Sequence, residues 1–290
     1  MLGGRSTLSN ARHSLAPGRQ RFIGRPAGAP GYHRRAWAML VTYDGAPYKG
    51  WQPHPRLPTV AGVLGAALHR CGIGATPFGA SRTDAGVHAR AQVASFSTRN
   101  TVDPLPLRDA LNAELPSTIR VLALREAASS FHAHWSSTGK VYRYRISLCG
   151  EVRAWRLPSE RFPYQQIDRE RLAHVLAFFE QASDVSAFAR AREHDPASRR
   201  LTRAAILEAD SRGVTLEFAA AGFGKYLVRN LVGGALGFAV GAYDEAALRA
   251  MLAREEQRPP RAEADGLSLH RVLYPPDLDP FADTDALVGT

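Results

Sequence analysis

Residues 78–96, FGASRTDAGVHARAQVASF, constrain the fold most strongly, because they place a polar turn between two apolar segments. The first apolar segment reaches Ala80, the turn covers residues 81–86, and an alternating pattern resumes at residues 92–96. This pattern predicts a strand, a loop and a second strand. We therefore expect the loop to carry Arg82, Asp84 and His88 out of a sheet.

Asp84 is a candidate catalytic carboxylate. Loops held by a rigid sheet are common positions for catalytic groups, and an aspartate beside an arginine is expected to stay ionised near neutral pH. A second interpretation is a structural turn, in which Asp84 caps the local backbone and Gly86 takes a positive φ angle. The spacing of the residues leaves both interpretations open.

The net charge of +10, from 37 basic and 27 acidic residues, indicates an anionic partner. Residues 1–38 hold seven arginines and no acidic residue, which leaves 30 basic and 27 acidic residues in the remainder. A nucleic-acid surface must therefore be a local patch. The best candidate is the loop at residues 188–203, whose arginines either contact phosphates or are simply solvated. The expected phosphate contacts are Arg190, Arg192, Arg199 and Arg200.

Cys71 and Cys149 are the only cysteines, and their wide separation argues against a thiolate zinc site and a disulfide framework. This usage fits a reducing compartment. No apolar run approaches the roughly 18 residues that a membrane span needs. The sequence also lacks a Walker motif, a dinucleotide fingerprint and clustered metal ligands. We therefore expect no membrane span, no metal and no cofactor.

Hydrophobic periodicity predicts a mixture of strands and helices. Neighbouring strands outnumber regular alternation of strand and helix, so we expect an α+β fold with two sheet-and-helix halves that form a cleft. The expected halves are residues 36–150 and 151–276, followed by an irregular tail at 277–290. Residues 1–35 are rich in Arg, Gly, Ser and Pro, which indicates a disordered or mis-called extension or a mitochondrial transit peptide. Strands are expected near 37–43, 119–124, 141–146, 204–209, 214–219 and 267–273, and helices near 60–71, 107–115, 172–179, 226–240 and 245–253.

Two of these elements carry polar side chains of interest. Arg229 lies near the start of the apolar helix expected at 226–240, where a charge normally needs a partner. In the strand expected at 141–146, Tyr142 and Tyr144 share one face, and Arg143 and Arg145 share the other. Such a strand suits RNA binding, although alternating strands are mostly half-buried sheet.

The segment SRTDAGVHA resembles the loop of the TruA family of tRNA pseudouridine synthases, whose pattern is G-R-T-D-x-G-V-H-A. Further similar segments follow in family order from about residue 40 to residue 275, so the resemblance covers nearly the whole chain after the N-terminal segment. These segments are Tyr43-Asp44-Gly45, Gly50-Trp51-Gln52, Leu111-Asn112-Ala113, Phe131-His132-Ala133, Tyr142-Arg143-Tyr144, LVRNLVG at 227–233 and Gly266-Leu267.

The resemblance implies a pseudouridine synthase fold with a central RNA-binding cleft. It implies a cytoplasmic homodimer that binds tRNA and converts uridine to pseudouridine at positions 38 to 40 of the anticodon arm; a transit peptide would instead indicate a mitochondrial enzyme. By resemblance, Asp84, Tyr142 and Arg229 are catalytic, and Arg229 is the basic partner of Asp84. The resemblance also implies that Arg82 helps place the flipped nucleotide and that Leu267 lines the pocket. His88 either contacts the substrate or stabilises the turn.

Pseudouridine formation exchanges one ribose–base bond for another without a redox change, so it needs no cofactor. It does need a carboxylate facing C1′, where positive character develops, as in glycosidases. Asp84 could act as a nucleophile, by electrostatic stabilisation or through proton removal at C2′. Substrate choice could have drifted, because four positions depart from the family pattern. Ser81 stands where the family commonly has Gly, Ala61 where it often has Gln, His134 where it often has Arg, and Tyr226 where His is frequent. The alternatives are a pseudouridine synthase for another RNA site and a non-catalytic RNA-binding protein.

Overall fold

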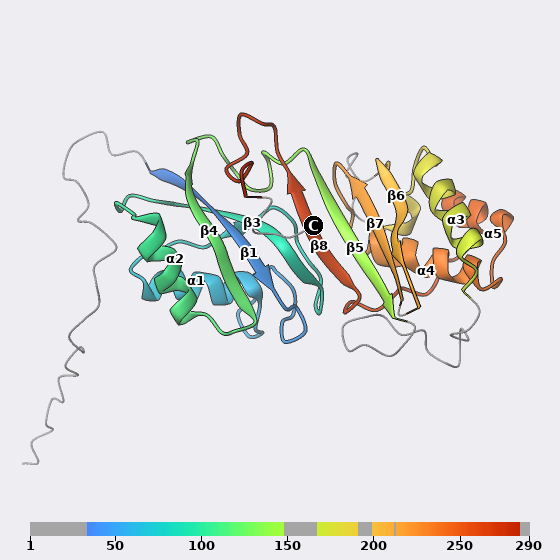
Figure 1. The fold of residues 1–290 in the computed structure, drawn as a ribbon, viewed down its shortest axis with the longest axis horizontal. Helices are drawn as coiled ribbons and strands as arrows, with labels where there is room; N and C mark the ends of the chain where they lie inside the picture. The colour runs from blue at the N-terminus through green and yellow to red at the C-terminus, as the bar shows by residue number, and fades with distance from the viewer. Residues whose placement is uncertain (1–33, 148–166, 191–198, 212, 285–290) are drawn as a thin grey trace, which may run out of the picture.

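The computed structural model describes residues 34–147, 167–190, 199–211 and 213–284 (Figure 1). They form an α+β fold, which confirms the predicted class. The N-terminal half contains β1 (Arg35–Tyr43), α1 (Val60–Arg70), β2 (Phe78–Gly79), β3 (His88–Thr98), α2 (Pro104–Glu114) and β4 (Ile119–Ala127). The C-terminal half contains β5 (Gly139–Ser147), α3 (Arg169–Gln181), the short 3-10 helix η2 (Ser186–Phe188), β6 (Arg203–Ala209), β7 (Gly213–Ala220), α4 (Leu227–Ala239), α5 (Glu245–Ala253) and β8 (Leu267–Leu273). Strand β5 is grouped here because it pairs with β7 and β8, although it lies within the expected first half at residues 36–150.

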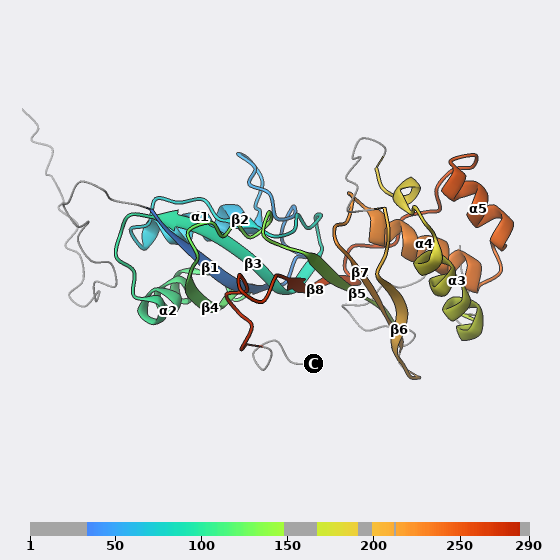
Figure 2. The ribbon, with the colours of Figure 1, turned by 90° about the horizontal axis from the view of Figure 1, so that it is seen from above.

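All the strands belong to one sheet with the order β4-β1-β3-β8-β5-β7-β6, and β2 pairs with β3. Helices α1 and α2 lie at one end of this sheet and α3, α4 and α5 at the other, with β8 and β5 between them (Figures 1 and 2). The two halves meet where β3 and β8 run parallel, and this pairing covers His88 with Ser268 and Ala89 with Leu269. The junction therefore brings the end of the Asp84 loop beside the start of β8.

The helices follow from the positions of their apolar residues. Helix α1 buries one stripe that includes Val60, Leu64 and Leu68, as its spacing predicts. Helix α4 is buried on nearly every side, which fits a sequence that is apolar all round. Helices α3 and α5 begin at aspartate caps: the Asp168 carboxylate accepts from two backbone N–H groups and the Asp244 carboxylate from one.

The structure departs from the sequence-based expectation in detail. The strand before the Asp84 loop is reduced to the two residues of β2. The tail, described up to residue 284, packs on the fold through the buried Phe281 and an Asp283–Arg125 ion pair. Most of the segment 1–35 lies outside the described residues. In the described parts of the chain, no helix is both long enough and apolar enough to cross a membrane.

Candidate active site

The Asp84 loop is a tight turn backed by a second loop. The Val87 N–H donates to the Asp84 carbonyl at 3.1 Å, and Gly86 has a φ angle of 81°, the positive value that the turn predicts. Gly50, with a φ angle of 93°, lies so close that a Cβ atom there would be 2.6 Å from the Thr83 carbonyl oxygen. The Trp51 N–H donates to the same oxygen at 3.1 Å. The Asp84 loop is thus held in place by the neighbouring loop at residues 50–51.

Buried polar side chains tie this loop to both halves of the sheet. The Gln92 side-chain amide on β3 accepts from the Ser81 N–H at 3.2 Å and donates to the Ser81 carbonyl at 2.7 Å. The Ser81 hydroxyl lies 2.8 Å from the Tyr142 hydroxyl on β5, and the Thr83 hydroxyl lies 2.8 Å from that of Tyr43 on β1. Ser81, a departure from the family pattern, therefore links the loop to the other half.

Asp84 and Arg229 face each other across the junction of the halves. The Arg229 Nη1 atom lies 3.7 Å from Asp84 Oδ2, with the arginine side chain 13% exposed and the aspartate side chain 20% exposed. The Arg229 Nε–H also donates to the Ala262 carbonyl at 2.8 Å, which orients the guanidinium. Burial lowers the pKa of Arg229, while the negative charge of Asp84 acts in the opposite direction. Arg229, the charged residue of α4 that was expected to need a partner, therefore has two: the Asp84 carboxylate and the Ala262 carbonyl.

Tyr142 forms part of an apolar wall beside the carboxylate. Burial raises the pKa of its phenol, and the negative charge of Asp84 raises it further, so the phenol is neutral at physiological pH. The Phe223 ring meets the Tyr142 ring edge-on at 5.1 Å between centroids. Leu267, buried at the start of β8, lines the same cavity. A base held here would meet aromatic and aliphatic surfaces.

These side chains surround a cavity of about 1110 Å³. Its lining residues come from both halves of the sheet, and they include six basic side chains but, of the described residues, one carboxylate, that of Asp84. The basic side chains are Lys49, Arg82, Lys140, Lys225, Arg229 and Arg261. Such a cavity suits a polyanion that presents one reactive group to the carboxylate. In the described residues, no cluster of three His, Cys, Asp or Glu side chains could hold a metal ion.

The structure separates the other predicted site residues. Arg82 is exposed, lines the cavity and makes no ion pair with a described residue. His88 lies beneath the turn at residues 44–45, with its Nδ1 atom 3.1 Å from both the Gly45 nitrogen and Asp44 Oδ1, and it does not line the cavity. This geometry matches the turn-stabilising alternative for His88.

The structure also separates the four arginines of the predicted phosphate-contacting loop. Arg190 lines a second pocket beside the cavity. Arg199 is exposed and lies 4.0 Å from the Asp184 carboxylate, and Arg200 is exposed. Neither of these two lines either pocket. Arg192 falls outside the described residues.

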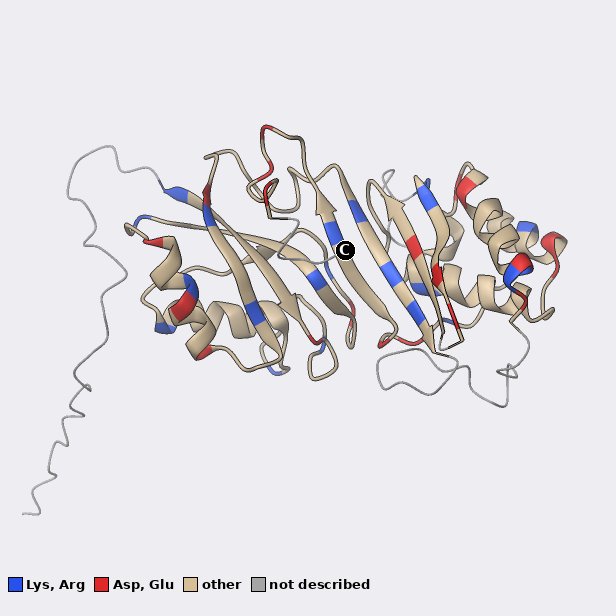
Figure 3. Cartoon of the chain, viewed as in Figure 1, with Lys and Arg blue, Asp and Glu red and all other residues tan. Residues whose placement is uncertain are grey.

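The arginines of β5 contact side chains of the neighbouring strand β7. Arg143 pairs with Glu217 on β7 at 3.0 Å, and the Arg145 Nη1–H donates to the Thr215 hydroxyl at 3.2 Å. Basic segments on β5 accordingly lie beside an acidic segment on β7 (Figure 3). This agrees with the half-buried interpretation of that strand.

An exposed aromatic group at the rim of the cavity was missed in the sequence. Trp135 is 79% exposed and Phe78 is 59% exposed, and both contact the ring of His132. The Trp135 ring also meets the His134 ring edge-on at 4.7 Å between centroids. Trp135 and His134 line the cavity. The run His132-Ala133-His134-Trp135, with three rings in four residues before a strand, is the signal that could have identified this rim.

Comparison with known proteins links this site to tRNA modification. The family model described as tRNA pseudouridine synthase matches residues 182–275. A protein of Moorella thermoacetica named tRNA pseudouridine synthase A is 36% identical over 250 residues, covering 81% of this chain and 98% of that protein. A protein of Desulfotalea psychrophila named tRNA pseudouridine synthase A 1 is 32% identical over 250 residues, which cover 81% of this chain and 98% of that protein.

A third relative gives the same result. The tRNA pseudouridine synthase A of Chlamydia trachomatis serovar L2b is 33% identical over 249 residues, which cover 82% of this chain and 91% of that protein. Matches of this extent include the Asp84 loop as well as the C-terminal half.

Proposed function

Because the chain belongs to the tRNA pseudouridine synthase A family, we propose that it isomerises uridine to pseudouridine in the anticodon arm of tRNA, at positions 38 to 40. The observation that carries this proposal is the Asp84–Arg229 pair, with 3.7 Å between Asp84 Oδ2 and Arg229 Nη1, at the floor of a basic cavity. A single carboxylate among six basic side chains suits a reaction on one nucleotide of a polyanion.

The reaction breaks the bond from N1 of uracil to C1′ of ribose, turns the base and joins C5 to C1′. C5 releases its proton and N1 takes one up, so the product is an isomer of the substrate. Positive character at C1′ calls for an anion facing that carbon. We assign this role to Asp84. The loop that carries it is fixed by backbone and side-chain hydrogen bonds, so the carboxylate is positioned before the substrate arrives.

Arg229 and Tyr142 support Asp84 in different ways. The Arg229 guanidinium favours the charged form of the carboxylate and is held in place by the Ala262 carbonyl. Tyr142 is a neutral phenol because burial raises its pKa, so it acts at neutral pH as a wall and hydrogen-bonding group rather than as a base. The detached base would turn against Tyr142 and Leu267. The target nucleotide must be flipped out of its stack to reach Asp84, and Arg82 would contact the phosphate of that flipped nucleotide.

The test is to incubate the purified protein with unmodified tRNA transcripts that carry uridine at position 38, 39 or 40. We expect release of the C5 hydrogen from labelled uridine, with pseudouridine mapped to these positions and absent when they are changed to cytidine. Pseudouridine elsewhere in the RNA would instead assign another target site. Binding without isomerisation would favour the non-catalytic alternative.

The resemblance to the family supports two further proposals. We propose that the protein works as a homodimer and that it acts in the cytoplasm. Light scattering of the purified protein should then give about twice the 31.6 kDa mass of one chain. A mass of one chain at micromolar concentration would contradict the dimer.

A further inference from the structure

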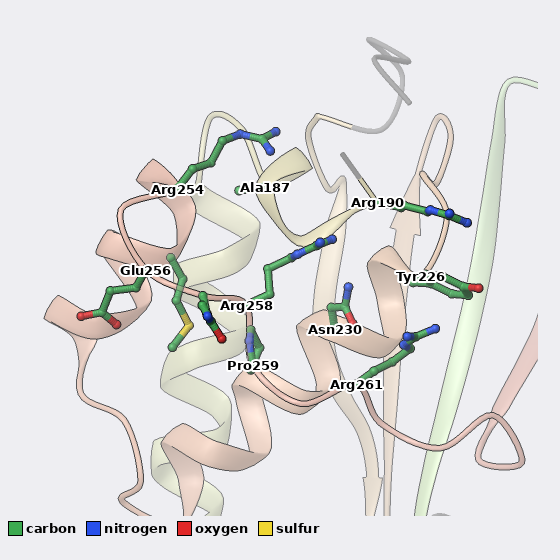
Figure 4. A pocket seen from close by; sticks show the side chains of 11 residues that line it. Ala187, Arg190, Tyr226, Asn230, Arg254, Glu256, Arg258, Pro259 and Arg261 are labelled. Carbon is green, nitrogen blue, oxygen red and sulfur yellow. The ribbon is translucent and has the colours of Figure 1, made fainter. Parts of the chain in front are cut away.

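A second pocket, of about 740 Å³, adjoins the reaction cavity on the side of α4 and α5 (Figure 4). Four arginines line it: Arg190 after η2, Arg254 at the end of α5, and Arg258 and Arg261 in the segment that leads to β8. All four are exposed. The pocket is therefore a local concentration of positive charge on a body whose total charge is only mildly basic.

These arginines have no close carboxylate partner: within the described ranges, none of the four lies within 4.0 Å of an acidic side chain. At longer range Arg254 acts on Asp184: burial raises the pKa of that carboxyl, but its hydrogen bonds with Ser186 and the charges of Arg199 and Arg254 lower it overall. Glu256 lines the same pocket, but its carboxylate points away from Arg190 and Arg258 (Figure 4). Guanidinium groups that gather without acidic partners repel one another unless an anion joins them, and their planar donors match phosphate oxygens.

Several contacts hold the pocket in shape. The Arg258 Nη1–H donates to the Ala189 carbonyl at 2.5 Å, which ties the segment after α5 to the loop after η2. The Arg190 N–H donates to the Lys225 carbonyl at 3.0 Å, which ties that loop to the start of α4. The Asn230 side-chain amide donates to the Phe188 carbonyl at 2.5 Å. The arginines thus project from a connected framework.

Tyr226 joins this pocket to the reaction cavity. Tyr226 and Arg261 line both spaces, and the Arg261 guanidinium lies 3.8 Å from the centre of the Tyr226 ring. Tyr226 has a φ angle of 68°, a conformation that bulky residues rarely adopt and that is concentrated at functional sites. A strand with one nucleotide in the cavity would pass this wall.

We infer that the arginine pocket binds backbone phosphates of the tRNA strand that flanks the target uridine, an inference that rests on the proposed function. It keeps Arg190 from the predicted loop patch of Arg190, Arg192, Arg199 and Arg200 and adds Arg254, Arg258 and Arg261. In this arrangement the RNA strand leaves the cavity past Tyr226, and its next backbone phosphates contact these arginines. They position the RNA and contact no reacting atom.

The test compares the double variant Arg190→Ala/Arg254→Ala with wild type in equilibrium binding of tRNA over a range of salt concentrations. Neither side chain has a hydrogen bond shorter than 3.5 Å to a described residue, so the fold should persist. We expect affinity near 0.15 M salt to fall by roughly tenfold and the slope of log K against log salt to decrease by about 1.4 to 1.8, as two lost phosphate contacts predict.

The matched control is Arg99→Ala/Arg120→Ala, which removes two exposed arginines that line neither pocket. Arg190→Lys/Arg254→Lys should restore most of the salt slope, because each lysine still neutralises a phosphate. The inference fails if the pocket variant binds tRNA like the control. It also fails if calorimetry shows that inorganic phosphate binds the wild-type pocket while the pocket variant keeps normal tRNA affinity. Since binding is measured without turnover, an inactive wild type that still showed the arginine-dependent slope would contradict the proposed function alone.

Discussion

At the scale of single residues, Arg229 connects the two halves of the site. Its guanidinium meets Asp84 from the other half and is held by the Ala262 carbonyl. The charge pattern predicted that Arg229 needs a partner, and the family resemblance identified Asp84 as that partner. The ion pair between the two side chains agrees with this prediction. Arg82, two residues before Asp84 in the chain, lines the cavity and makes no ion pair with a described residue.

Replacing Arg229 with methionine tests this assignment. We expect turnover to fall by about 100-fold, since a preorganised charge beside the carboxylate is lost. The acid limb of the activity profile should move to higher pH, because Asp84 ionises less readily without the positive charge. The free energy of unfolding should fall by only about 1–2 kcal/mol, because an unbranched apolar side chain suits α4 and one hydrogen bond is lost. Initial rates from pH 5 to pH 9 and urea unfolding measure these effects. An unchanged rate and profile would remove Arg229 from the site.

The arginines of the second pocket show why some site residues escape sequence reasoning. Arg254, Arg258 and Arg261 lie in a segment that also contains Glu255 and Glu256. The local charge is nearly balanced in the sequence, so no basic patch stands out. The fold then separates the charges by turning the arginines to one side and Glu256 to the other.

At the scale of elements, the turn between β4 and β5 presents Trp135 on a fixed base. The Ala133 N–H donates to the Ser95 hydroxyl at 3.0 Å, and the Tyr274 hydroxyl donates to the Ala133 carbonyl at 2.7 Å. Burial and the nearby His134 lower the pKa of His132, so this ring is neutral at physiological pH. An exposed ring on a rigid turn beside the cavity suits stacking with an unpaired RNA base.

Trp135→Ala should weaken tRNA binding by about 5- to 150-fold, the range expected for one lost base stack. Trp135→Phe should retain most of the affinity. Leu105→Ala on α2 is the matched control, because Leu105 is also exposed, at 61%, and does not line the cavity. Equilibrium binding of tRNA measures all three variants. Equal losses for Trp135→Ala and Leu105→Ala would exclude a stacking role.

Most elements could be predicted from local patterns, and their pairing could not. The apolar stripe of α1 and the alternation of β5 follow from spacing within one segment. The parallel contact between β3 and β8 joins residues that lie far apart in the chain, His88 with Ser268 and Ala89 with Leu269, so no local signal encodes it. This contact nevertheless places Leu267 beside the Asp84 loop.

At the scale of the whole molecule, four buried tyrosines make stability sensitive to alkaline pH. Burial raises the pKa of Tyr43, Tyr142, Tyr144 and Tyr274. In the unfolded chain these phenols lose their protons near pH 10, whereas in the folded protein they keep them. Their contribution to stability is therefore complete below pH 10 and is lost progressively above it.

We expect the free energy of unfolding to fall above pH 10 with a slope of up to about 5 kcal/mol per pH unit, the sum for four phenols. Urea unfolding between pH 8 and pH 11.5 measures this slope. Tyr144→Phe should reduce it by roughly a quarter. A free energy of unfolding that stays constant up to pH 11.5 would show that these phenols ionise freely in the folded protein.

The whole molecule brings Asp84 from one half to Tyr142 and Arg229 from the other, and we propose that isomerisation depends on that carboxylate. The most direct measurement is single-turnover pseudouridine formation by Asp84→Asn on a tRNA with uridine at positions 38 to 40, with Asp109→Asn on the surface of α2 as the isosteric control. We expect Asp84→Asn to lose at least about 1000-fold in rate while its tRNA affinity stays within about twofold of wild type, because the charge acts at the transition state. Turnover by Asp84→Asn within about tenfold of the wild-type rate would contradict the assignment of Asp84 as the catalytic carboxylate.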